Sequence, residues 1–376
     1  MRFVTCACLL GLPLLVAACG DDGGEGGAAS GTITVQISGE ELATDGFGFP
    51  TGSEVTIADG WELQFDAIFV TVGRVWLAEN PDKAPADQSQ MGEVVAEQVG
   101  PWAVDISKLG PVAGAGGEGT ATPLFVFENQ NLKGGEPFSS TERYAFNYSI
   151  VPAAQGAMAV NFAGDSAAEA RYAEAVAGGC SMLLVGTATF RGETCEVSEP
   201  SYDFTSIPES FPFALCIDAP SEQLNCQNEN NQGEAFADES FQRGGPIKQN
   251  DTSIAQITLH LDHLLYSDVQ HEPRLFFDAF AAALVGAPPD TTLTFDMLAG
   301  MDTSGFVDGA QNPLPWRVCD GSLLPAGAQR SYDAGTIPVG PGVQPSQGFR
   351  DYRDYVRYVV SAQGHLNGGE GICYTS

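Results

Sequence analysis

Segments in which apolar and polar residues alternate predict β-strands, because successive side chains of a strand point to opposite faces. The clearest of them is TITVQIS at residues 32–38. Residues 61–77, WELQFDAIFVTVGRVWL, alternate too, and a change of phase near Asp66 and Ala67 predicts either two strands or one bulged strand. Further strands are predicted at residues 122–127, 144–151, 182–190 and 253–265, and a polar surface loop at residues 80–93.

Helical signals are fewer and shorter. Ser166 and Glu169 have the spacing of a capping box and open a run of helix formers that two glycines end. Residues 273–285 carry apolar side chains at helical spacing, and residues 349–360 carry an apolar face opposite Arg and Asp. The pattern as a whole predicts a mainly β protein, an antiparallel β-sandwich with a few short peripheral helices.

The beginning of the chain has the anatomy of an export signal. Arg2 precedes an apolar stretch at residues 3–18 that is too short to span a bilayer and ends in small residues. The sequence LVAAC that closes it resembles the lipobox of bacterial lipoproteins. That resemblance implies that residues 1–18 are a signal peptide and that Cys19 receives acyl chains such as palmitate, which anchor the protein to a membrane. A plain secretory signal with an incidental cysteine is the alternative.

The segment that follows predicts a tether. Residues 19–31, CGDDGGEGGAASG, have no apolar periodicity, and Gly-rich chain is a flexible coil. Gly20 differs from the acidic residue that retains lipoproteins at the inner membrane of enteric bacteria, so we expect the outer membrane, with the protein facing the periplasm or the surface. Residues 32–376 are then a β-rich envelope domain, large enough for one or two subdomains.

The charge of the chain excludes one class of partner. Asp and Glu number 48 against 16 Lys and Arg, and the net charge of −32 becomes −33 when Arg2 leaves with the signal. Such an excess repels phosphate backbones, so we expect no nucleic-acid binding. The acidic residues are scattered, which is typical of a solvated surface.

The cysteines predict a cross-linked domain. Of the 9 in the chain, Cys6 and Cys8 leave with the signal and Cys19 takes the lipid. An even number remains in an oxidising compartment, which predicts three disulfides with their pairing left open. The polar segment between Cys216 and Cys226 looks like a loop that a disulfide could close. No Cys-x-x-Cys pair occurs, which argues against redox catalysis and a zinc ribbon. The six candidates are Cys180, Cys195, Cys216, Cys226, Cys319 and Cys373.

Histidines carry the main chemical signal. The chain has only 4, and three of them, His260, His263 and His271, fall within a short segment. On a strand, His260 and Asp262 would share a face, and His263 would either lie opposite or turn toward the same pocket. His365 follows the last predicted helix in a Gly-rich loop that can fold back. Imidazole and carboxylate suit zinc or copper, so we expect a metal site at His260, Asp262, His263 and His365. Solvated histidines without a metal are the alternative, and His271 is the weakest candidate.

Two further motifs give weaker signals. TLHLDH at residues 258–263 is similar to the His-x-His-x-Asp-His motif of metallo-β-lactamase-like hydrolases, but Thr258 replaces the first histidine. That family also needs two further histidine ligands downstream of the motif, and this sequence has few histidines to supply them. Residues 114–119, GAGGEG, match a dinucleotide-loop pattern, yet no helix follows to receive a phosphate, so we expect a loop.

The arrangement of the whole chain adds a distant resemblance. The strand pattern of residues 61–77, the later His-bearing strand and the C-terminal Gly364-His365 are similar to uncharacterised envelope lipoproteins of Gram-negative bacteria. They are more distantly similar to periplasmic copper-binding proteins associated with methanobactin uptake. This resemblance implies a β-sandwich that binds copper, and it transfers no ligand residues. We therefore expect a non-catalytic, membrane-anchored lipoprotein that holds copper or zinc. The alternatives are a metal-free cell-surface interaction protein and a metal-dependent hydrolase.

Overall fold

The structure of the chain is a computed structural model. The structure describes residues 31–49, 55–116, 119–231, 233, 235–237, 239–267, 274–301, 306–324, 349, 351–369 and 371–376. The predicted signal peptide, Cys19, all of the tether before residue 31 and His271 lie outside the described residues. Within the described part, the fold is mainly β, as the alternating segments predict, with two large sheets and a few short helices.

The smaller sheet is built around β1 (Thr32–Ser38), which has the bounds that its alternation predicts. It pairs with β5 (Thr120–Phe127) in antiparallel and with β13 (Thr252–Leu259) in parallel orientation. The parallel pair departs from the expected antiparallel arrangement, because β1 and β13 meet across most of the chain and no hairpin joins them. Two edge strands complete the sheet, β4 (Val112–Ala113) and β16 (Gly364–Leu366).

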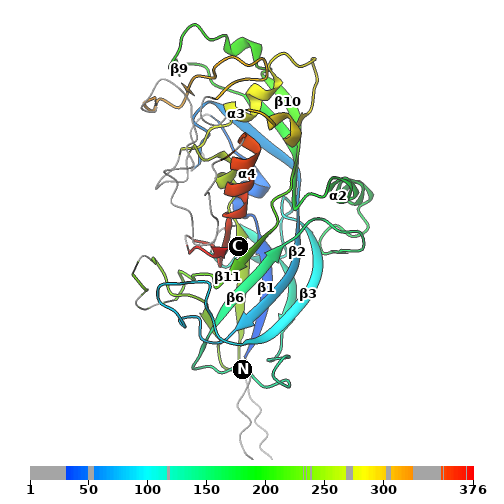
Figure 1. Cartoon of the computed structure of the whole chain (residues 1–376). Coiled ribbons are helices and arrows are strands. Elements are labelled where there is room, and N and C mark those ends of the chain that lie inside the picture. Colours follow the sequence, from blue (N-terminus) through cyan, green and yellow to red (C-terminus); the bar gives the residue numbers. More distant parts are fainter. Residues whose placement is uncertain are drawn as a thin grey trace, which may run out of the picture.

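The larger sheet follows β2 (Trp61–Ala78), which runs along most of the molecule (Figure 1). Its register shifts between Phe65 and Ala67, so the change of phase in the sequence marks one bulged strand. The other strands of this sheet are β3 (Val94–Asp105), β6 (Arg143–Ile150), β7 (Met158–Ala159), β8 (Met182–Phe190), β10 (Ser210–Ile217), β11 (Ser221–Leu224), β12 (Gly245–Pro246), β14 (Leu293–Thr294) and β17 (Tyr374–Thr375), while β9 (Glu196–Val197) and β15 (Arg317–Val318) form a separate pair.

The helices are short and occupy the periphery or one end of the sandwich. Asp165, not Ser166, caps the longest one, because its carboxylate accepts the backbone N–H groups of Ala167 and Ala168. None of the helices in the described ranges combines the length and apolar character needed to cross a bilayer. The helices are α1 (Glu40–Asp45), α2 (Ser166–Gly178), α3 (Asp278–Ala281) and α4 (Tyr352–Ser361), with 3-10 turns η1 (Phe204–Ser206), η2 (Leu261–Leu265), η3 (Ala282–Leu284) and η4 (Phe295–Leu298).

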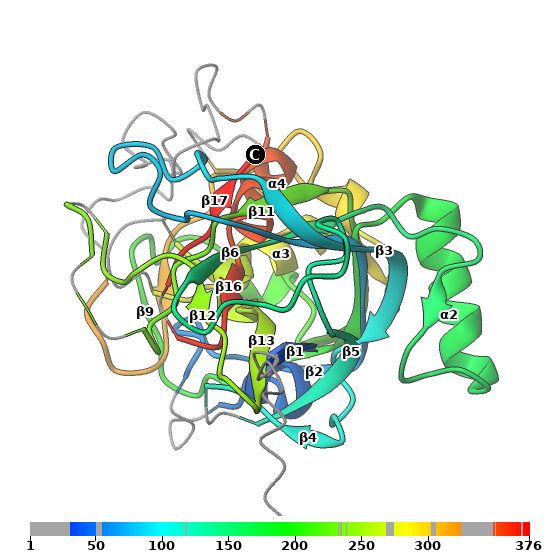
Figure 2. The same cartoon turned by 90° about the horizontal axis from the view of Figure 1, so that it is seen from below.

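The core lies between the two sheets. Val35 of β1 and Val72 of β2 belong to the same buried apolar cluster, and both are fully buried. Viewed from below, β13, β1 and β5 lie on one side of this core and β6 and β3 on the other (Figure 2). The helix α4 adds Tyr355 and Val356 to the same cluster, so its predicted apolar face is buried.

The six described cysteines form three disulfides, as their even number predicts. The pairs are Cys180–Cys216, Cys195–Cys319 and Cys226–Cys373. The polar segment between Cys216 and Cys226 is not closed on itself, because each of these cysteines pairs with a distant partner. The Cys226–Cys373 disulfide joins the chain after β11 to the segment that follows β16. His365 lies in β16.

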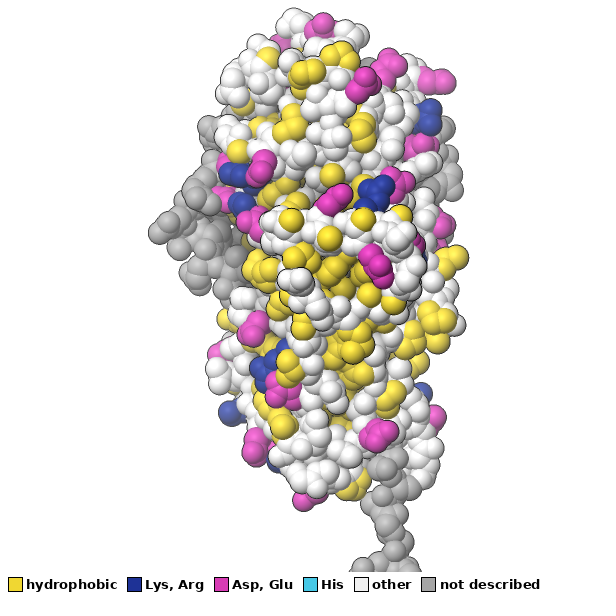
Figure 3. All heavy atoms as spheres, turned by 90° about the vertical axis from the view of Figure 1, so that its right-hand side faces the viewer, with side chains coloured by type: hydrophobic (Ala, Val, Ile, Leu, Met, Phe, Trp, Pro, Cys, Tyr) yellow, Lys and Arg dark blue, Asp and Glu magenta, His cyan; other side chains and the backbone are white. Residues whose placement is uncertain are grey.

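The face that carries α2 shows the surface character of the domain. Acidic side chains are scattered over it, and apolar side chains gather in a band across its middle (Figure 3). The helix itself covers a second, smaller apolar cluster, in which Tyr172 packs against Phe69 and Phe162. The scattered carboxylates on this face agree with a solvated acidic surface.

Candidate metal centre

The end of β13 brings two histidines together. The strand ends at Leu259, and His260 is the N-terminal cap of the 3-10 turn η2, in which His263 lies. Side chains three residues apart in a 3-10 turn lie on the same side, so the turn places both imidazoles together. Two positions were expected for His263. The structure shows the second, in which the strand ends before His263 and this residue turns toward the same side as His260. The predicted strand at residues 253–265 is therefore shorter than its apolar pattern suggests.

The third histidine comes from the other end of the chain. His365 lies in β16, which is antiparallel to β13 with His365 opposite Thr258. It was expected in a loop that folds back, and the structure instead fixes it in the sheet next to the η2 turn. Its side chain is buried, with 4% exposed. The pairing of β13 with β16 thus brings together residues that lie more than 100 positions apart in the sequence.

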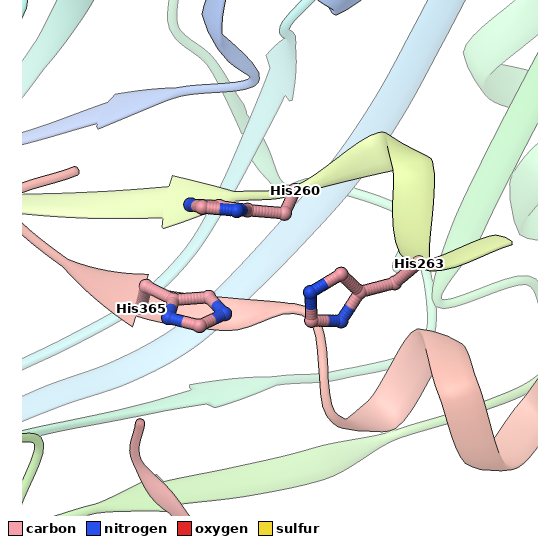
Figure 4. Close-up of side chains that lie close together, drawn as sticks. All are labelled: His260, His263 and His365. Carbon is pink, nitrogen blue, oxygen red and sulfur yellow. The ribbon is translucent and has the colours of Figure 1, made fainter. Parts of the chain in front are cut away.

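The three imidazoles face one another (Figure 4). One nitrogen of each lies within 4.8 Å of one nitrogen of the others. The rings of His260 and His365 are stacked at 4.2 Å between centroids, and His263 is edge-on to His365 at 5.4 Å. A metal–nitrogen bond of about 2.0 Å needs nitrogens closer than this upper limit, so coordination requires the rings to turn toward a common point.

Each ring has an oxygen-bearing neighbour outside the cluster. His365 Nδ1 lies 3.1 Å from the carbonyl oxygen of Gly371, and since a carbonyl only accepts, Nδ1 carries the proton. His263 hydrogen-bonds to the backbone of Ala362, and this bond favours the protonated ring, so the carbonyl is the acceptor. The carboxylate of Glu40 lies 3.6 Å from His260 Nε2. Metal-ligating histidines characteristically donate their second N–H to such oxygens.

Two of the three rings, those of His263 and His365, are in the protonation state that metal binding requires. Burial lowers the pKa of His263 from 6.5 to about 4, although the charge of Asp262 acts in the opposite direction. Burial also lowers the pKa of His365 well below 6.5, and positive charge on the two other histidines would lower it further. Both rings are therefore neutral at neutral pH. A neutral imidazole has a lone pair to offer a metal ion.

Asp262 is not among the side chains that the turn brings together. Its carboxylate accepts a hydrogen bond from the hydroxyl of Tyr266 at 3.1 Å, and it does not belong to the group of converging ligand atoms. The expected set of four therefore reduces to three histidines in close array, with Asp262 near enough to influence the pKa of His263.

Thr258, which replaces the first histidine of the hydrolase-like motif, has a structural role. Its hydroxyl accepts the backbone N–H of Gly368 at 2.8 Å and the side-chain amide of Gln256 at 3.0 Å. Thr258 and Gln256 are both buried. Residues of the segment after β4 cover them, since the Ala115 N–H donates to Gln256.

Glu40 is the residue near this site that sequence reasoning missed. It follows β1, whose parallel register with β13 puts Ser38 opposite Thr258, and continuing that register puts Glu40 beside His260. The sequence holds no local signal for this neighbour, because the pairing of β1 with β13 joins segments far apart in the chain.

Three imidazoles without a thiolate form a ligand set suited to zinc or copper. Three protein ligands also leave a position for water or an exogenous ligand. Comparison with known proteins found no matching family model, no matching curated protein and no matching solved structure. The chemistry of this chain must therefore be argued from its own residues.

Proposed function

We propose that this protein is a non-catalytic envelope lipoprotein that binds one transition-metal ion, copper or zinc, through His260, His263 and His365. The observation that carries the proposal is the convergence of three imidazoles, one ligand nitrogen of each lying within 4.8 Å of those of the others, while Nδ1 of His365 faces the carbonyl of Gly371. Hydrogen-bonded histidines of a purely structural kind have no need to converge.

The energetics of His365 support a ligand. Its Nε2 atom is buried and has no hydrogen-bond partner within the described chain. Leaving a buried polar atom unsatisfied costs about 1–3 kcal/mol, and a metal ion at this position would remove that cost.

The proposed location of the protein in the cell rests on its sequence. The apolar leader and LVAAC at residues 15–19 support export and acylation of Cys19. Disulfides persist in the oxidising envelope and are rare in the cytosol, so the three cross-links agree with that location. We propose an outer-membrane location through the lipid, with the acidic domain held away from the bilayer by residues 19–31.

Metal analysis tests the binding proposal directly. The domain, residues 20–376, would be exported to a periplasm, purified with its disulfides intact, stripped with a chelator and titrated with Zn²⁺ and with Cu²⁺. We expect one ion per chain, and loss of high-affinity binding in His260→Ala, His263→Ala and His365→Ala. His271→Ala is the matched control and keeps its affinity. A stoichiometry near zero with both metals would overturn the proposal and favour a metal-free cell-surface protein.

A further inference from the structure

Glu40 has an unusual backbone for its residue type. Seven described non-glycine residues have positive φ, and five of them are Asn or Asp, which tolerate this region. Glu40, at φ 60°, is one of the other two. A short polar side chain would fit this backbone conformation better. The presence of glutamate therefore indicates that its own side chain is required here. Residues held in such conformations cluster at functional sites.

The surroundings hold the carboxylate of Glu40 in place. Its side chain is only 13% exposed, and its backbone N–H donates to the Ser38 hydroxyl at 2.9 Å. Gly368 closes the other side: a Cβ on this residue would meet the Gly116 Cα at 2.8 Å and would lie 3.8 Å from Glu40 Oε1. The Gly-rich segment around Gly116 thus packs against the turn beside His365. The carboxylate lies between that turn and His260.

We infer that Glu40 is a positioning residue for the metal, an inference that rests on the proposed function. On a slightly closer approach, the carboxylate of Glu40 accepts the Nε2 proton of His260, which leaves Nδ1 of this histidine to bind the ion. His365 has the opposite arrangement, because its Nδ1 donates to Gly371 and its Nε2 faces the cluster. A small rotation of either side chain converts the 3.6 Å separation of Glu40 and His260 into a hydrogen bond.

The electrostatics explain why a carboxylate is useful at this place. Three neutral imidazoles provide no negative charge to a divalent ion. A half-buried carboxylate beyond one imidazole makes that ring a stronger donor and offsets part of the ion's charge in a site with little water. The two backbone carbonyls behind His263 and His365 provide only dipoles, so Glu40 is the one formal negative charge among these three acceptors.

The test separates the role of Glu40 from its effect on folding. Glu40→Asn removes the carboxylate from the reach of His260 and suits the positive φ, and Glu40→Gln keeps the length and removes the charge. Glu41→Gln is the matched control, because Glu41 is the exposed neighbour. We expect the affinity for Zn²⁺, measured by competition with a chelating dye, to fall about 10- to 100-fold in Glu40→Asn and less in Glu40→Gln. Glu41→Gln keeps the wild-type affinity.

A second readout follows the imidazole itself. Nitrogen NMR of the metal-free protein at neutral pH should show His260 with its proton on Nε2, and Glu40→Asn should shift it toward a mixture of tautomers. The thermal midpoint of metal-free Glu40→Asn should equal or exceed that of the wild type, which rules out misfolding as the cause of weaker binding.

The outcomes distinguish this inference from the proposed function. If the wild type binds one ion and Glu40→Asn binds it equally well, the positioning role is wrong and the metal site stands. If the wild type binds no ion, the proposed function fails and the positioning role fails with it. An Nδ1 proton on His260 in the wild type would overturn the assignment of the ligating nitrogens by itself.

Discussion

At the scale of single residues, the site is defined by which nitrogen of each histidine is already engaged. The carbonyl of Gly371 fixes the tautomer of His365, and the carbonyl of Ala362 does the same for His263. A buried ring with a fixed tautomer presents its lone pair in one direction only. The site is therefore organised for a ligand by backbone groups, which substitutions of side chains leave largely intact.

The lowered pKa values predict an acid-sensitive metal-free protein. His263, with a pKa of about 4, binds a proton in the unfolded state near 6.5 but not in the folded state. The unfolded state therefore takes up more protons below pH 6.5, and stability that is complete above this pH is lost as the pH falls toward 4. We expect a loss on the order of 2–3 kcal/mol, measured as the urea midpoint against pH with chelator present.

The groups around His263 define the control for that experiment. Asp262 opposes the shift, and positive charge on His260 adds to it. His263→Asn, which cannot titrate, should flatten the part of the profile between pH 6.5 and pH 4, whereas His271→Ala should leave it unchanged. An equally steep profile in His263→Asn would show that other groups cause the acid sensitivity.

The residue types of the site were largely predictable, and its neighbours were not. A cluster of histidines in a chain that has only 4 is visible in the sequence, and so is the chance that His365 joins it. Glu40 could not be found, because its place depends on the parallel register of β1 and β13. Asp262 was expected as a ligand because a strand was extended past Leu259, where the chain turns instead.

At the scale of elements, clear alternation predicted several strands, and strands that contain proline were missed, among them β3 and β10. The segment of β3 around Gly100 and Pro101 and that of β10 around Pro212 resemble strand breaks. In β3, Pro101 lies where the register with β2 shifts between Val72 and Arg74, so the ladder needs no N–H from it. Whether a segment of this kind forms a strand depends on tertiary pairing, which a single sequence does not reveal.

The disulfide nearest the site is expected to affect metal binding. Cys373 follows Gly371, whose carbonyl holds His365, and its partner Cys226 lies on another strand end. The double variant Cys226→Ala, Cys373→Ala should lose about 3–5 kcal/mol of unfolding free energy and also bind Zn²⁺ more weakly, because the carbonyl is no longer held in place. Urea unfolding and dye competition measure the two effects.

A second disulfide separates stability from metal affinity. Cys180–Cys216 lies beside α2, in the smaller apolar cluster. The double variant Cys180→Ala, Cys216→Ala should be less stable and keep the wild-type affinity. If both pairs of substitutions weaken binding equally, the loss reflects general loosening and not the position of the Gly371 carbonyl.

A buried ion pair joins α3 to the pair of strands β9 and β15. Asp278 is fully buried, its carboxylate accepts the Arg317 Nε–H at 3.1 Å, and it also accepts the Trp61 indole N–H at 2.8 Å. Asp278→Ala should lower the unfolding free energy by about 3–5 kcal/mol, because it leaves the guanidinium buried without its counter-charge. Urea unfolding of the disulfide-bonded protein measures the loss.

The contribution of the uncompensated charge can be isolated. The double variant Asp278→Ala, Arg317→Leu should be more stable than Asp278→Ala alone, since no buried charge remains. Asp296→Ala is the surface control: this carboxylate is 92% exposed, lies 3.3 Å from Arg353 and is expected to contribute about 0–1 kcal/mol. A double variant less stable than Asp278→Ala would contradict the argument.

At the scale of the whole molecule, one long strand and one parallel pair organise the domain. The strand β2 pairs with β3, β6 and β8, so it links the part of the sheet beside α2 to the part beside the C-terminal strands. The pairing of β1 with β13 then brings the first described strand to the cluster of three histidines. The mainly β class follows from local alternation, while this global order depends on contacts between distant segments.

The proposed lipid anchor at Cys19 can be tested by labelling. If Cys19 is acylated, the exported protein should incorporate a labelled fatty acid and enter the detergent phase on phase separation, and Cys19→Ser should do neither, because no thiol is left to carry the lipid. Cys8→Ser is the matched control, since this cysteine lies in the leader that is removed. Mass spectrometry of the mature N-terminus locates the modification. A labelled Cys19→Ser variant, or a mature chain that begins elsewhere than residue 19, would show that the leader is a plain secretory signal.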